Sequence, residues 1–306
     1  MDYIKMMKER NIQFNLVEEF EAERIFRVEY SYYKLLEYSP LFPRYNGDRE
    51  INKFVKLDFL QLYYIAKIDE KFSHITMLAC LDIEQALKTI ILFDMDKNDI
   101  KQQVLDDFLA FDREYILSTY TPDNFQIISE KYMSNNILSL ELEQVIDIFQ
   151  FGSLIRFFDF IKENYSDFVE LKKYELIGKH LNSAKNIRNI VAHNNSLISQ
   201  LNIRHELKTD IVSSFIGQNG VKNKTLRTNM SKKIVFDFCH LLHLYYLIVP
   251  KEKILQMQKE IQNFFNIIDE NYSSILKDNQ TLHSVYNFLQ MVTNVYEKFF
   301  EKSIDN

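Results

Sequence analysis

The sequence predicts an all-α protein, and three observations carry that prediction. The 306 residues include only five Gly and four Pro, so the residues that usually punctuate strands and turns are scarce. Apolar side chains recur at three- and four-residue spacing along most of the chain, as in amphipathic helices. No segment alternates apolar and polar residues strongly enough to predict a strand. Hydrophobic residues make up 46% of the chain, which favours a folded core over disorder.

The N-terminal part of the chain is predicted to form short helices and then a loop. Residues 2–38 look like two helices, and the second has an apolar face made of Phe20, Ile25, Val28 and Tyr32. Residues 38–47 contain two prolines and end in Asn46-Gly47, a combination typical of turns.

Longer helices are predicted in the middle of the chain. We expect one helix over residues 51–66 and a longer one over 70–93. The apolar face of the longer helix comprises Ile75, Leu78, Leu81, Leu87 and Ile91. Residues 98–117 repeat the amphipathic pattern, and Pro122 marks a break at which a new helix can start.

The remaining elements are predicted from apolar runs and their breaks. An apolar and aromatic segment is interrupted at Gly152, and a loop near Tyr165 leads into a short helix and then a helix that ends near His193. Residues 217–233 are the most polar part of the chain and are predicted to be a loop. The apolar segments outside these breaks are predicted helices, at residues 142–161, 234–249, 251–269 and 281–300.

These elements suggest three regions that pack into one compact unit. Residues 1–50 would form an N-terminal helical extension, residues 51–200 a helical core that carries Arg188 and His193, and residues 201–306 a C-terminal helical region packed on that core.

The charge distribution is compatible with contact to a few phosphates. The net charge of −6 argues against a protein that coats itself with nucleic acid. Two segments are nevertheless basic, and their cations are Lys172, Lys173, Lys179, Lys185 and Arg188 in the first and Lys222, Lys224, Arg227, Lys232 and Lys233 in the second. Such patches suit limited phosphate binding. Solvated helix faces would look the same, so both interpretations stay open.

Cysteine usage and hydropathy predict a cytoplasmic protein. Cys80 and Cys239 are far apart in sequence and lack metal-binding spacing, as expected of free buried thiols in a reducing compartment. The charged N-terminus is not followed by the apolar region of a signal peptide. The longest apolar runs, such as residues 241–249, are too short to span a bilayer, so we expect no membrane association.

The segment Arg188-Asn189-Ile190-Val191-Ala192-His193 carries the candidate chemistry. Arginine is a permanent cation that binds phosphate through a fork of N–H groups, and histidine exchanges protons near neutral pH. Together they supply what metal-free RNA cleavage requires, a proton-transfer group and a cation that stabilises the phosphorane. The spacing alone is weak evidence, because an arginine that caps carbonyls and a histidine packed at an interface would give the same pattern.

Helix geometry places these two side chains on different faces. At ~100° per residue, Arg188 and His193 are about 140° apart around an ideal helix. Asn189 and His193, four residues apart, share a face. A site composed of residues from two subunits would bring the arginine and the histidine together better than one helix can.

Three blocks, in order over about residues 10–200, resemble a known family. The first is Tyr32-Tyr33-Lys34-Leu35-Leu36-Glu37-Tyr38, and the second comprises Phe54, Leu62-Tyr63, Asp69, Ile83-Glu84 and Leu87-Lys88. The third comprises Phe151-Gly152-Ser153-Leu154 and the segment from Arg188 to His193. The set is similar to the abortive-infection (Abi) proteins of the AbiD/AbiF type, a branch of the HEPN superfamily of helical ribonucleases.

The chain departs from the family pattern at several positions. Lys34 and Lys88 stand where arginine is usual, and Glu37 stands where glycine is usual. Asn194-Asn195-Ser196 replaces the His-x-Arg often found after the motif histidine. These changes bear on accessory contacts more than on Arg188 and His193.

The resemblance implies a fold, an activity and partners. The fold would be a HEPN-like helical bundle with additional N- and C-terminal helices. The activity would be metal-independent endoribonuclease cleavage in anti-phage defence, with Arg188 and His193 as catalytic residues and no cofactor. A homodimer would place both pairs near its two-fold axis. An antitoxin, a regulatory RNA or an infection trigger would restrain the enzyme.

Other residues are candidates for supporting roles. Asn189 would orient His193 or bind phosphate, or it would only bridge backbone groups. Glu84 would orient Arg188 or His193, or it would only pair with Lys88 one helical turn away. The candidate RNA-binding residues are Asn194, Lys185, Lys179, Lys222, Lys224 and Arg227.

Alternative functions stay open at the level of sequence. The same fold could hold a structured small RNA without cutting it, or the chain could be a helical interaction protein in which the Arg/His pair is structural. His240 and His243, with Asp237 and Cys239 nearby, could begin a metal site, but the spacing disfavours zinc.

Overall fold

The computed structural model describes residues 2–45, 53–119, 140–206 and 209–304, and almost all of them are helical. The all-α prediction is confirmed. Within these ranges the strands are only two residues long, β1 (Ile12–Gln13) and β2 (Leu57–Asp58), and they pair in parallel with Ile12 opposite Leu57. This short pairing fastens the N-terminal segment to the start of the longest helix.

The elements of the N-terminal half are helices of very different length. In chain order with the two strands they are α1 (Tyr3–Glu9), α2 (Glu19–Val28), α3 (Tyr32–Leu36), the 3-10 turn η1 (Ser39–Leu41), α4 (Phe59–Lys97), α5 (Lys101–Thr119), α7 (Leu142–Ile148) and α8 (Phe151–Asn164).

The elements of the C-terminal half complete the bundle. They are the 3-10 turn η3 (Ser166–Phe168), α9 (Leu171–Ala192), the 3-10 turn η4 (Ile198–Asn202), α10 (Ile211–Gln218), α11 (Asn223–Met230), α12 (Lys233–Ile248), α13 (Lys251–Asn271), α14 (Ser273–Asp278) and α15 (Gln280–Ile304).

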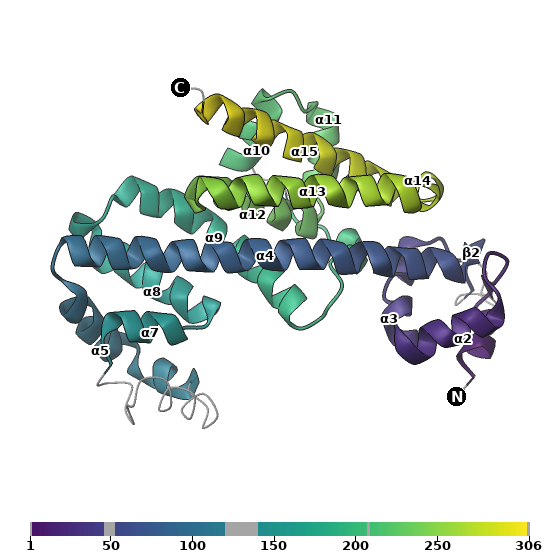
Figure 1. The fold of residues 1–306 in the computed structure, drawn as a ribbon, viewed down its shortest axis with the longest axis horizontal. Helices are drawn as coiled ribbons and strands as arrows, with labels where there is room; N and C mark the ends of the chain where they lie inside the picture. Colours follow the sequence, from purple (N-terminus) through teal and green to yellow (C-terminus); the bar gives the residue numbers. More distant parts are fainter. Residues whose placement is uncertain (1, 46–52, 120–139, 207–208, 305–306) are drawn as a thin grey trace.

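Helix α4 is the spine of the molecule and runs along nearly its whole length (Figure 1). A capping box starts it, because the Asp58 carboxylate accepts from the Leu60 N–H and the Gln61 side chain accepts from the Asp58 N–H. The prediction of two helices here is wrong. The residues between them, 67–69, include no helix breaker, and the buried side chains of Ile68 and Asp69 continue the inward face.

The other helices gather around this spine. Helices α9 and α12 pack along each other, and both pack on α4, as does α13. Figure 1 shows α5, α7 and α8 at one end of α4, the N-terminal helices at the other, and α15 with α10 and α11 beyond α13. Motif blocks that are far apart in sequence can therefore meet along one helix.

Aromatic side chains fill much of the interior, as the abundance of Phe and Tyr suggests. Phe158 of α8 and Tyr174 of α9 stack with ring centroids 4.6 Å apart and planes inclined by 4°, and both side chains are buried. A second aromatic cluster joins α5 to α8, in which the Phe108 and Phe157 rings meet edge to face at 4.7 Å. Aromatic pairs of this kind add to the free energy gained by burial.

Several predicted details at the N-terminal end are wrong. Residues 2–38 form three short helices rather than two, because the chain turns to pair β1 with β2. On α2, Phe20 and Val28 are exposed and only Ile25 of the predicted face is buried there. Few elements pack against α2 at this end of the molecule, so one side of the helix stays exposed.

Two further details differ along the middle of the chain. Helices α9, α12 and α13 pack on one face of α4. Leu78 and Leu81 lie outside that face and are therefore exposed. The break in the apolar segment after residue 142 falls at Phe149 and Gln150, and Gly152 lies within the first turn of α8. The predicted break at Pro122 and the Asn46-Gly47 turn lie outside the described residues.

The polar segment 217–233 is not a loop, which corrects that prediction. Residues Asn223–Met230 form α11, whose buried Leu226 and Met230 lie four residues apart and face the bundle. The cationic side chains of this helix lie on the side opposite Leu226 and Met230. Two apolar anchors per two turns are enough to hold a short helix when tertiary packing covers them.

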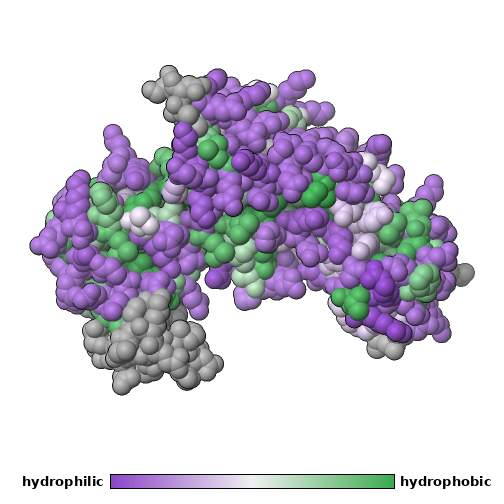
Figure 2. All heavy atoms as spheres, viewed as in Figure 1, coloured by the Kyte–Doolittle hydropathy of each residue, from purple (hydrophilic) through white to green (hydrophobic). Residues whose placement is uncertain are grey.

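The surface drawn in Figure 2 is mainly hydrophilic and is interrupted by apolar patches. Within the described ranges, no helix combines the length and the apolar character that crossing a bilayer requires.

Replacing Phe158 by alanine should lower the free energy of unfolding by about 3–5 kcal/mol, because it removes a buried ring and leaves Tyr174 facing a cavity. Urea denaturation followed by circular dichroism measures the change. The matched control is Phe93→Ala on α4, whose ring is exposed, and it should change stability by less than about 1 kcal/mol. Equal losses in both variants would contradict this account of the core.

Candidate functional site

The site is built around the C-terminal end of α9, where the chain leaves the helix in a fixed geometry. His193 is the C-cap residue that follows Ala192, the last helical position, and Asn194 follows with φ +54°, in the left-handed region. The Asn194 N–H donates to the Val191 carbonyl and the Asn195 N–H to the Ile190 carbonyl, both at 2.9 Å. This is a Schellman ending, and asparagine tolerates its left-handed residue better than most side chains do. His193 therefore sits exposed on a rigid turn.

The first motif block contacts this turn directly. The Lys34 ammonium of α3 donates to the Asn194 carbonyl oxygen at 2.8 Å and pairs with Glu37 at 3.3 Å. The carbonyl it contacts belongs to the first residue beyond the cap of α9. A lysine can make this single point contact, so the departure from arginine at position 34 does not break the link between α3 and the His193 turn.

The second block anchors the segment just after the turn through Asp69. This carboxylate is buried in the middle of α4 and accepts from the Ile198 N–H at 2.8 Å and from the Tyr38 hydroxyl at 3.0 Å. Burial raises the pKa of Asp69, while hydrogen bonds from Ile198, Ser196 and Tyr38 act in the opposite direction. One buried side chain thus ties α3, α4 and the segment after α9 together.

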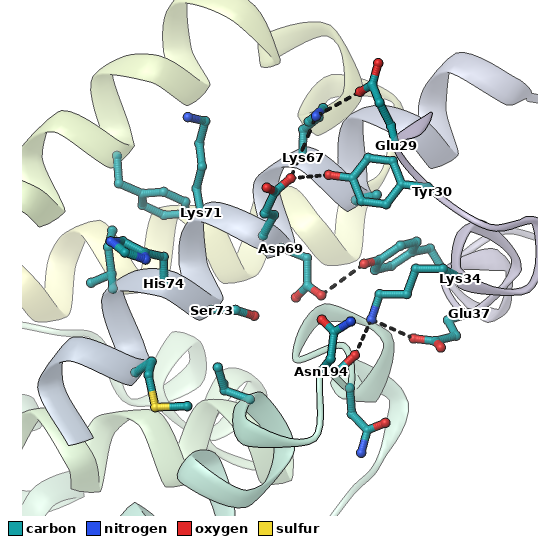
Figure 3. Close-up of a pocket in the computed structure, with 18 of the residues that line it drawn as sticks. Glu29, Tyr30, Lys34, Glu37, Lys67, Asp69, Lys71, Ser73, His74 and Asn194 are labelled. Atoms are coloured by element: carbon teal, nitrogen blue, oxygen red, sulfur yellow. Dashed lines mark hydrogen bonds and ion pairs between the residues drawn. The ribbon is translucent and has the colours of Figure 1, made fainter. Parts of the chain in front are cut away.

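A pocket of about 1250 Å³ opens where these elements meet. Helix α3 and the residues before it form one side, α4 crosses the middle, α13 closes another side, and the His193 turn forms the floor. Figure 3 shows Ser73 of α4 directed toward the side where Lys34 and Asn194 meet, with Lys71 extending toward α13 and His74 on the other side of α4 from Ser73. Polar and apolar surfaces contribute almost equally to its lining, and the polar part includes several charged side chains.

Most acidic side chains of this pocket are already paired. Glu29 contacts the Lys67 ammonium at 3.0 Å, and Lys67 is also 3.7 Å from Glu70. The Tyr30 hydroxyl donates to Glu70. Among the lining side chains within the described ranges, Lys71, His74, His193 and the exposed acid Glu260 have no hydrogen bond or ion pair.

Arg188 lies elsewhere on α9, away from this pocket. Its half-buried guanidinium is near Cys80 of α4, whose pKa is raised to about 12 by burial, with Arg188 lowering it and Glu84 raising it. The Glu84 carboxylate pairs with Lys88 at 3.1 Å, and Lys88 also donates to the Asp147 carbonyl oxygen. In the described part of the chain, Arg188 itself has no ion pair.

Within one chain, therefore, the proposed catalytic pair is not brought into one cleft. His193 lines the pocket and Arg188 does not, in agreement with their angular separation on the helix. Glu84 makes the ion pair with Lys88 that the i, i+4 spacing allows, and it lies on the Arg188 side of α9 rather than beside His193. Asn189 is exposed, one helical turn before His193.

The candidate RNA-binding residues fall into separate places. Asn194 belongs to the pocket, whereas exposed Lys179 and half-buried Lys185 lie further back along α9. A third group stands on the exposed side of α11, and its members are Lys222, Lys224 and Arg227. The structure thus offers a pocket and a distant basic helix rather than one continuous basic face.

Three other histidines, His180, His240 and His243, form a largely buried cluster. The Nδ1 atoms of His180 and His240 are 2.9 Å apart, and His243 Nδ1 is 2.8 Å from the Tyr296 hydroxyl. Burial lowers the pKa of His180 to about 3 and that of His243 to about 4, so neutral rings fit this packing. Across the described part of the chain, no three His, Cys, Asp or Glu side chains are arranged to bind a metal ion together.

Comparison with known proteins identifies the family. Residues 28–199, more than half of the chain, match the family model of the Abi-like proteins. The chain belongs to the Abi-like protein family. This membership points to abortive-infection defence, and the match covers the motif blocks, α9 and the pocket residues of α3, α4 and the His193 turn, but not α10 to α15. No curated protein and no solved structure matches the chain.

Sequence reasoning missed the residues that hold this Abi-like site in place. Lys34, Tyr38 and Asp69 belong to the blocks that carry the resemblance, yet no role could be given to them without the fold. An acidic residue in the middle of an otherwise apolar helical face was the available signal, because a buried carboxylate needs hydrogen-bond partners. The structure identifies those partners as Tyr38 and the segment that follows His193.

The raised pKa of Asp69 predicts a pH-dependent contribution to stability. Between the unfolded and folded pKa values the folded chain keeps a proton that the unfolded chain has lost, so stability falls as pH rises through that interval. Asp69→Asn removes the titration. The free energy of unfolding of wild type relative to this variant should therefore decrease from about pH 4 toward neutral pH, as measured by urea denaturation.

The control for this measurement is Glu175→Gln, which changes an exposed carboxylate on α9. Its difference from wild type should stay nearly constant with pH. If the difference in unfolding free energy between wild type and Asp69→Asn is also constant with pH, burial does not raise the pKa of Asp69.

Proposed function

We propose that this Abi-like protein is a metal-independent endoribonuclease of the HEPN type that acts in abortive-infection defence. The observation that carries the proposal is the placement of His193, an exposed imidazole on a rigid helix end, in the wall of a large pocket. Membership of the family supports the defence role. In this reaction His193 transfers a proton and Arg188 stabilises charge on the phosphate.

The proposed reaction is an in-line transesterification of RNA. The 2′-oxygen attacks the adjacent phosphorus as its proton passes to a base, and the bond from phosphorus to the 5′-oxygen breaks as that oxygen gains a proton. The products carry a 2′,3′-cyclic phosphate and a 5′-hydroxyl. The guanidinium of Arg188 would neutralise the extra negative charge on the pentacoordinate phosphorus.

A homodimer is the second part of the proposal, because one chain keeps the two side chains apart. A two-fold axis beside α9 would bring Arg188 of one protomer near His193 of its partner. The exposed side chains of Leu78 and Leu81, one turn apart on α4, offer an apolar surface that a second protomer could cover. Apolar side chains in the centre of an interface are typical of stable dimers.

A non-catalytic alternative is favoured by the same separation of Arg188 and His193. If the chain works as a monomer, the pocket and the basic side of α11 could hold a structured RNA without cutting it. Lys222, Lys224 and Arg227 would then contribute phosphate contacts and make binding sensitive to salt.

Cleavage assays separate these functions. His193→Ala and Arg188→Ala should each lower RNA cleavage in EDTA at least about 100-fold, because each removes a group that acts in the transition state. The products should carry cyclic phosphate ends. Exposed His283→Ala on α15 and Arg27→Ala on α2 are the matched controls and should keep wild-type rates. Unchanged cleavage in both site variants would overturn the ribonuclease assignment.

A mixing experiment tests the composite site. Co-expression of Arg188→Ala and His193→Ala chains produces heterodimers in which one of the two sites keeps both groups. Activity should reappear at roughly a quarter of the wild-type level, since about half of the dimers are mixed and each has one intact site. A site formed within a single chain would give no recovery.

A further inference from the structure

We propose that the pocket beside His193 binds a short single-stranded segment of RNA, with an unpaired base stacked on Tyr33 and the backbone phosphate held by Lys71 and His74. This inference rests on the proposed function and assigns the part of the site that recognises the substrate. None of these three side chains belongs to the Arg188/His193 pair. All of them line the pocket.

Tyr33 has the features of a stacking platform. Its side chain is 65% exposed, whereas Tyr32 and Tyr38 of the same block are buried. The Tyr32 ring lies 5.2 Å from the Tyr33 ring at an angle of 81°, and this edge contact orients Tyr33. An aromatic ring that is positioned in advance and open to solvent loses little entropy when a base stacks on it.

Lys71 and His74 provide the contact to the backbone. They stand three residues apart on α4 and therefore on one side of it, and both line the pocket. The other lysines drawn there are engaged, Lys67 with Glu29 and Lys34 with Glu37 and the Asn194 carbonyl. Among the described residues Lys71 has no carboxylate partner, so its charge is available to a phosphate.

The shape of the pocket favours a single strand over a duplex. Its volume of about 1250 Å³ exceeds the ~300–1,000 Å³ of ordinary small-molecule sites, which leaves room for more than one nucleotide. The lining acids Glu29 and Glu37 are neutralised by lysines, which leaves Glu260 of α13 as the unpaired acid among the described lining residues and Lys71 as the unpaired lysine. A base can reach Tyr33 only when it is unstacked and unpaired, which excludes regular A-form helices.

Two asparagines beside His193 can form hydrogen bonds with the bases of the bound strand. Asn194 and Asn195 are exposed at the same wall, and His193 stands between them and the end of α9. Amide side chains can donate to and accept from the edges of a base. A strand that runs from Tyr33 toward Lys71 would thus pass the His193 turn, where the proposed cleavage takes place.

The test measures RNA binding in a His193→Ala background, so that cleavage does not remove the ligand. The probe is a dye-labelled RNA without self-complementarity, compared with the same strand annealed to its complement, and anisotropy reports affinity. We expect the single strand to bind more tightly than the duplex. Tyr33→Ala should weaken single-strand binding about tenfold or more, while Tyr33→Phe should retain it, because stacking needs the ring rather than the hydroxyl.

Lys71→Ala should weaken binding. It should also reduce the slope of log affinity against log salt concentration by about 0.7, the value for one lost contact to a single-stranded phosphate. The matched controls are Phe20→Ala, an exposed aromatic residue of α2, and Lys172→Ala, an exposed lysine of α9. Neither residue lines the pocket, and both variants should bind as the parent does.

The outcomes separate this inference from the ribonuclease proposal. If Tyr33→Ala and Lys71→Ala bind RNA as tightly as the parent, the pocket assignment is wrong even when Arg188 and His193 prove essential for cleavage. That result would point to another occupant, such as a protein segment. If both variants lose binding but the wild-type protein cuts no RNA, the pocket assignment stands and the ribonuclease proposal falls.

Discussion

The buried carboxylate of Asp69 is the interaction on which the arrangement of this site depends. It stands near the middle of α4, accepts hydrogen bonds from Tyr38 and from the backbone of Ile198, and so joins three segments that are far apart in sequence. A carboxylate in that position is costly to bury without partners. The segment after α9 and the end of the first motif block are therefore held where they can satisfy it.

This constraint brings the three motif blocks together in space. Block one supplies Lys34 and Tyr38, block two supplies Asp69, and block three supplies His193 with its turn. Each contact is modest in energy, because a hydrogen bond contributes only about 1 kcal/mol net. Together they fix the position of an exposed imidazole without touching it, which leaves His193 free to meet a substrate.

The same packing explains why Arg188 and His193 are separated. Helix α9 lies against α4, so its side chains divide between a face near Cys80 and Glu84 and an end that opens into the pocket. A single straight helix cannot bring residues five positions apart onto one face. If the two groups act together, a second protomer supplies the missing one.

The sequence by itself determined the fold class, most helix positions and the family to which the chain belongs. Those features depend on local information: helical periodicity, the scarcity of Gly and Pro, and the ordered family blocks. It failed where tertiary contacts decide the outcome, as in the unbroken course of α4, the exposure of Leu78 and Leu81, and the helix at residues 223–230. The sequence could not predict the pocket for the same reason. Only the fold brings Tyr33, Lys71 and His193 to one cavity, since their proximity depends on how α3, α4 and the end of α9 pack rather than on their spacing along the chain.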